Sequence, residues 1–118
     1  MIVFDNGTQF ECDPVIDIEK RYQNIPRRCL EIILKNTTFE AVKPVFTSGE
    51  LFSIQDTYTD EEGTQHTETY PKPEFCICGG IKDNLDGTIF VEMFGKTDAE
   101  MEMEQMQQAY NILIGKEQ

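Results

Sequence analysis

The last stretch of the chain, Thr97 to Gly115, constrains the fold most because it has the pattern of an amphipathic helix. Thr97 and Glu100 are spaced as a capping box, in which each side chain accepts a hydrogen bond from the other residue's backbone N–H. Apolar residues then recur at steps of three and four, which places them on one stripe of a helix. They are Ala99, Met103, Met106, Tyr110 and Leu113. We predict that this stripe packs on a β-sheet.

The rest of the chain is organised as short alternating strands separated by turn residues. Asn6-Gly7 predicts a type I′ hairpin turn. Thr37 and Glu40 are spaced as a second capping box and predict a short helix through about Phe46. Cys78-Gly79-Gly80 lies inside a strand pattern and predicts a bulge or a close backbone approach. The predicted strands cover residues 2–4, 9–12, 15–22, 27–35, 51–58, 64–70, 75–82 and 88–95.

These elements predict a single α+β domain over residues 1–118. Its sheet is expected to be mostly antiparallel, with about six to eight strands, and to be packed by the C-terminal amphipathic helix and the one short helix. The hairpin over residues 51–70 is polar along both arms. We therefore expect this hairpin to stand out from the body of the domain.

Negative charge is concentrated in the second half of the chain, which has a net charge of −12 overall. Residues 1–49 hold seven acids and six bases, whereas residues 50–118 hold fifteen acids and four bases. Such an acidic half would repel phosphates, so we expect neither direct nucleic-acid binding nor attachment to an anionic membrane. A basic protein partner remains open, as does a charge that only keeps the protein soluble.

The chain is expected to be made and kept in a cytosol. It has no run of eighteen apolar residues, and its start lacks the basic flank and long apolar region of a signal peptide. In a cytosol the four cysteines are expected to be reduced thiols that pack as small hydrophobes. They are Cys12, Cys29, Cys76 and Cys78.

We predict no catalytic residues, no cofactor and no metal site, so we do not expect an enzyme. His66 is the only histidine and lies in a polar strand pattern, although a Cys–His pair is arithmetically open. Residues 82–87 resemble part of a calcium loop, but Lys82 and Met93 occupy positions that require acids. Arg27-Arg28 is too small a basic spot for a nucleic-acid footprint.

Two groups of residues are candidate partner contacts. The methionines of the last helix are expected to fill the core, except for Met101, which lies off the main stripe. The second group is acidic and lies on the 51–70 hairpin, where carboxylates could take the place of phosphates. Its members are Asp56, Asp60, Glu61, Glu62 and Glu68.

Several short segments, in this order, carry a resemblance to a known family. They are Phe4-Asp5-Asn6-Gly7-Thr8, Tyr22-Gln23-Asn24 with Arg27-Arg28, Val45-Phe46-Thr47 at a helix end, and the closing strand with its amphipathic helix. Over nearly its whole length the chain resembles short uncharacterised proteins encoded in the tail-gene region of prophages in clostridial-type Firmicutes. The Cys-Ile-Cys strand and the acidic second half depart from that family.

The resemblance implies a non-enzymatic phage or prophage protein that acts by protein–protein contacts, as a tail-associated structural or assembly component. Its partners would be phage tail proteins or further copies of the chain. The acidic second half supports an alternative, in which a small phage-encoded inhibitor occupies the nucleic-acid channel of a basic host defence protein by phosphate mimicry.

Overall fold

β4 (Ile25–Lys35) is the longest strand and lies inside the sheet β3-β4-β8-β7. Its alternation buries Leu30, Ile32 and Leu34 on one face, as the sequence predicts. The computed structural model describes residues 1–117 and the side chains of residues 1–113. The partners of β4 in this sheet are β3 (Ile16–Tyr22), β8 (Thr88–Phe94) and β7 (Ile77–Asp83), all antiparallel to their neighbours.

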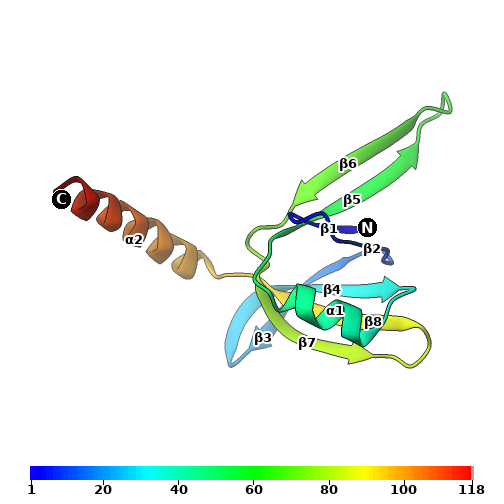
Figure 1. Ribbon diagram of the computed structural model, residues 1–118, viewed down its shortest axis with the longest axis horizontal. Helices are drawn as coiled ribbons and strands as arrows, with labels where there is room; N and C mark the ends of the chain where they lie inside the picture. Colours follow the sequence, from blue (N-terminus) through cyan, green and yellow to red (C-terminus); the bar gives the residue numbers. More distant parts are fainter. Residues whose placement is uncertain (118) are drawn as a thin grey trace.

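A second four-stranded sheet has the order β2-β1-β5-β6 (Figure 1). Its strands are β1 (Ile2–Phe4), β2 (Gln9–Phe10), β5 (Phe52–Thr59) and β6 (Gln65–Pro71). The core lies where its buried residues meet those of β4 and β8, and it includes a cluster of aromatic rings. The α+β class and the antiparallel pairing are confirmed, with the eight strands divided between two sheets.

The short helix α1 (Phe39–Phe46) contributes Val42 and Phe46 to this core. The ring of Phe46 lies 5.0 Å from that of Phe4, edge to face. The helix ends where the sequence predicts, but its N-cap is Thr38 instead of Thr37. The hydroxyl of Thr38 accepts a hydrogen bond from the backbone N–H of Ala41, which satisfies one free donor of the first turn.

A turn with positive φ at two successive residues occurs between β3 and β4 and does not occur at Asn6-Gly7, where the sequence predicts it. In the first hairpin only Gly7 has a positive φ, so the type I′ turn expected at Asn6-Gly7 is wrong. The pair with positive φ at both residues is Gln23-Asn24, which joins β3 to β4. β7 carries the expected bulge, since its register against β8 shifts between Cys78 and Gly80.

The C-terminal helix α2 (Asp98–Glu117) does not pack on a sheet, so the predicted burial of its stripe is wrong. It projects from the end of β8 as a separate rod (Figure 1). Met103, Met106, Tyr110 and Leu113 are 71%, 67%, 58% and 62% exposed.

The reason lies in the sheet that precedes the helix. One of its faces already lies against the core, and the other carries an ion-pair cluster in which Lys20 contacts both Glu31 and Glu92 at 2.8 Å. Neither face of this sheet is therefore free to receive an apolar stripe.

The hairpin of β5 and β6 extends beyond the body, as predicted (Figure 1). Every residue of β6 is exposed. With α2 and this hairpin projecting, the radius of gyration is 17.2 Å, whereas a compact domain of this length would have about 13.5 Å. Among residues 1–117, neither helix is both long and apolar enough to cross a lipid bilayer.

Candidate functional site

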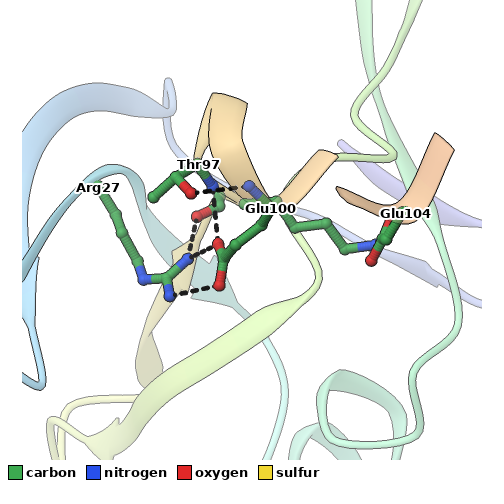
Figure 2. Close-up of polar contacts among 6 residues, drawn as sticks. Arg27, Thr97, Glu100 and Glu104 are labelled. Atoms are coloured by element: carbon green, nitrogen blue, oxygen red, sulfur yellow. Dashed lines mark hydrogen bonds and ion pairs between the residues drawn. The ribbon is translucent and has the colours of Figure 1, made fainter. Parts of the chain in front are cut away.

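The start of α2 is tied to the body by a buried arginine. Arg27 lies on β4 with only 8% of its surface exposed. Its Nη1 donates to the carbonyl of Gly95 at 3.1 Å and to Oε1 of Glu100, while its Nη2 donates to Oε2 of Glu100 at 2.9 Å (Figure 2). This two-point contact sets both the position and the direction of the first helical turn, because a guanidinium and a carboxylate pair in one plane.

The predicted capping box at the same point is confirmed. The backbone N–H of Thr97 donates to Glu100 Oε1 at 2.8 Å, and that of Glu100 donates to Thr97 Oγ1 at 3.2 Å (Figure 2). The hydrogen bonds from Arg27, followed by that from the Thr97 backbone, lower the pKa of Glu100 to about 2. A second contact, from Lys96 Nζ to Glu104 at 2.6 Å, lies one turn further on.

Five exposed apolar residues on α2 form one stripe, which we call the α2 seam, and Ile112 is exposed outside it. It consists of Ala99, Met103, Met106, Tyr110 and Leu113. Met101, the methionine singled out as a candidate contact, is half-buried and lines an open cleft of about 450 Å³ with Phe75 and Lys96. The uncovered methionines of α2 are therefore Met103 and Met106, which the sequence assigns to the core, and Met93 of β8 is the methionine that lies in the core.

The acidic hairpin residues have different environments. Asp56 lies directly opposite Glu68 on the neighbouring strand. Glu68 accepts hydrogen bonds from the hydroxyls of Tyr70 and Tyr58, the latter at 3.1 Å, and these contacts lower its pKa. Glu61 and Glu62 are exposed at the tip. The hairpin thus brings two carboxylates together on one face, flanked by tyrosines that the sequence reasoning did not single out.

Asp60 organises the hairpin tip. Its Oδ1 accepts the backbone N–H groups of Glu62 at 2.9 Å and Thr64 at 2.8 Å. Its Oδ2 lies 2.6 Å from Nε2 of His66, whose ring stacks on Tyr58. The contact with His66, followed by that from Thr64, lowers the pKa of Asp60. His66 is exposed on a strand, as predicted, and its ring nitrogen pairs with a carboxylate of the tip.

The remaining motifs are a loop between two strands and the four cysteines. The loop from Asp83 to Thr88 is a hairpin turn in which Asp86 Oδ1 accepts the backbone N–H of Thr88 at 2.9 Å. All four cysteines are free thiols, and burial raises the pKa of Cys29 to about 11. Among the side chains that the structure describes, those of residues 1–113, no three of His, Cys, Asp or Glu converge as metal ligands would.

Neither side of the buried anchor was identified as such from the sequence. Arg27 was read with Arg28 as a small basic spot. Its place two residues before Cys29, on the same face of the strand, is the signal that could have found it, since a buried arginine requires a carboxylate partner.

Comparison of the chain with models of known protein families, with curated proteins and with solved structures finds no match in any of the three.

Proposed function

We propose that this protein is a non-enzymatic phage or prophage component that acts by protein–protein contacts, as a structural or assembly part associated with the tail. It would act in the bacterial host cytoplasm or on the virion. The observation that carries the proposal is the uncovered α2 seam, because a helical stripe that displays four large apolar side chains to water is typical of an element completed by a partner.

Two further features support a role in assembly. The projecting β5–β6 hairpin offers β6 as an edge strand, which can pair with a strand of a neighbouring protein. The buried anchor at Arg27 and Glu100 holds α2 at one angle to the body. A rigid body with two outward elements suits repeated contacts with neighbours better than it suits chemistry.

Retention by phage particles tests this proposal. The tagged chain would be mixed with purified tails and with lysate from an induced lysogen, and the captured proteins would be identified by mass spectrometry. We expect tail proteins to be captured by the wild-type chain and lost with Met106→Glu, but retained with Gln108→Glu, which adds the same charge elsewhere on α2. Capture of no tail protein by any variant would contradict the proposal.

The acidic hairpin supports a second candidate, an inhibitor that occupies the nucleic-acid channel of a basic host defence protein by phosphate mimicry. The specific observation is the Asp56–Glu68 pair, in which two like charges lie directly opposite each other on exposed strands. Like charges so placed destabilise a sheet, and a cationic partner would relieve their repulsion.

Salt dependence separates the two candidates. Binding of a basic nuclease should weaken steeply between low and physiological salt, and Asp56→Asn should reduce it, if the acidic hairpin mimics phosphates. Asp86→Asn, an acid in a different hairpin, serves as the control. Binding that is absent or insensitive to salt would rule out the inhibitor.

A further inference from the structure

The spacing of the α2 seam is that of a coiled coil. The intervals between its five members are four, three, four and three residues, which is the a/d pattern of a heptad. A stripe of this kind is narrower than the apolar face with which helices usually cover a globular core. The seam is therefore shaped to meet another helix.

The helix has little other support along most of its length. Past Met101, every side chain that the structure describes on α2 is exposed. Most of the stability of helices in proteins comes from packing of an amphipathic face. A partner helix on the seam would supply that packing.

The charge distribution selects the orientation of the partner. Asp98, Glu100, Glu102 and Glu104 lie in the first seven positions of α2, whereas residues 105–113 carry no charge. A parallel partner with the same sequence would bring these acids side by side. An antiparallel partner would keep the two acidic first turns at opposite ends of the pair and would also align the two helix dipoles favourably.

The shape of the molecule selects the same orientation. Paired helices lie about 8–10 Å apart, and each α2 carries the whole body at its N-terminal end (Figure 1). The shortest dimension of the molecule is 25 Å. A parallel pair would crowd two such bodies at one end, whereas an antiparallel pair would hold them at opposite ends.

We infer that α2 pairs with α2 of a second copy of this chain in an antiparallel, two-fold coiled coil. Met106 packs against the partner's Tyr110, and Met103 packs against the partner's Leu113; the symmetry makes each contact twice. A thioether against an aromatic ring is a favourable contact. This inference rests on the proposed assembly role, whose self-association it makes specific.

Sedimentation over a range of concentrations tests the pairing. The full chain should approach twice its 13.6 kDa mass as concentration rises. Met106→Glu and Tyr110→Glu should each weaken the dimer by roughly tenfold or more, and Gln108→Glu should not. All these sites are exposed, so circular dichroism should show an intact body in each variant. A chain that is monomeric throughout, or equal effects of Met106→Glu and Gln108→Glu, would overturn the inference.

Cross-linking tests the orientation. Copies bearing Met106→Cys are mixed with copies bearing Tyr110→Cys and oxidised, and the cross-linked peptides are identified by mass spectrometry. The wild-type chain, treated in the same way, shows which links come from its own four thiols. Links between positions 106 and 110 of two copies are expected. Links only between identical positions would overturn the antiparallel arrangement.

The outcome also separates this inference from the assembly role. A monomer that is still captured by tail particles would overturn the pairing alone. A dimer that is never captured by them would support the pairing and contradict the assembly role.

Discussion

A glycine in β7 lies against the ring of Phe94, and no room is left between them for a methyl group. A Cβ built at Gly79 would overlap Cε2 and Cδ2 of that ring, whereas one at Gly80 would meet its nearest neighbour at 3.9 Å. Phe94 cannot easily move aside, because its other contacts include stacking on Tyr22 at 4.8 Å between ring centroids. Substitution of Gly80 therefore serves as a control for the same substitution at Gly79.

Gly79→Ala should lower the free energy of unfolding by about 1–3 kcal/mol, since the added methyl forces side chains out of their preferred positions. Gly80→Ala should change it much less. Urea unfolding of both variants measures the difference. Equal stability of the two would mean that Phe94 can turn away at no cost.

Cys29 and Cys76 should react very differently with iodoacetamide at about pH 8. Cys29 is fully buried, and burial raises its pKa to about 11, so little of it is thiolate at that pH. Cys76 is only partly buried. Mass spectrometry over time should show Cys76 modified first and Cys29 modified only after unfolding. Early labelling of Cys29 in the folded chain would contradict its burial.

At this scale the sequence predicts local chemistry well and long-range partners poorly. The Thr97–Glu100 capping box and the bulge at Cys78 to Gly80 depend on neighbours in the chain, and both are confirmed. The bond from Arg27 to Glu100 joins residues far apart in sequence. Only the folded strand order brings them together, so spacing along the chain carries no sign of it.

Among the elements, α2 depends on its anchor in a way that pH should reveal. The pKa of Glu100 is about 2 in the folded chain, against an ordinary value of 4.5. A lowered pKa stabilises the folded state above the ordinary value, and the stabilisation is lost as pH falls toward the folded value. Wild type should therefore exceed Glu100→Gln in thermal stability at pH 7, with the difference shrinking between about pH 4.5 and 2. A difference that is constant with pH would exclude this carboxylate as its source.

The error in placing α2 is instructive about elements. Its periodicity predicts correctly that it is helical, but the apolar stripe that it predicts to be buried is exposed. Periodicity does not say what an apolar stripe packs against, because sheets and helices both accept one. The ion pairs of Lys20 on the outer face of its neighbouring sheet close off the nearest intramolecular site. Those ion pairs join three strands and could not be read from one segment.

For the molecule as a whole, the projecting hairpin should be dispensable for folding. Joining Gln55 to Thr69, which lie opposite each other, by Asn-Gly would remove the outer arms and leave a two-residue turn. The free energy of unfolding should change by less than about 1 kcal/mol, because the removed residues are exposed except for the half-buried Asp60, whose contacts lie within the removed tip. Phe52→Ala, in the buried part of β5, should cost about 3–5 kcal/mol. Thermal unfolding compares the two.

The strands, their hairpin pairing and the projecting hairpin were all predictable from alternation and turn residues. The division into two sheets was not. It follows from β1, which pairs with both β2 and the distant β5, and this long-range pairing draws the hairpin away from the strands that follow it. Alternation shows which residues a strand buries and leaves open which strand lies beside it.

The ion pair between Arg27 and Glu100 holds the first turn of α2, so a small change of angle there moves the far end of the helix by a large distance. A helix of twenty residues is about 30 Å long, so a tilt of about 10° at its first turn would displace its far end by about 5 Å, which is one helical turn. The Arg27–Glu100 pair therefore controls the position of anything that binds at the far end of α2. If the proposed assembly forms, a mutation that loosens this pair should make the spacing of its subunits irregular before it unfolds a single subunit.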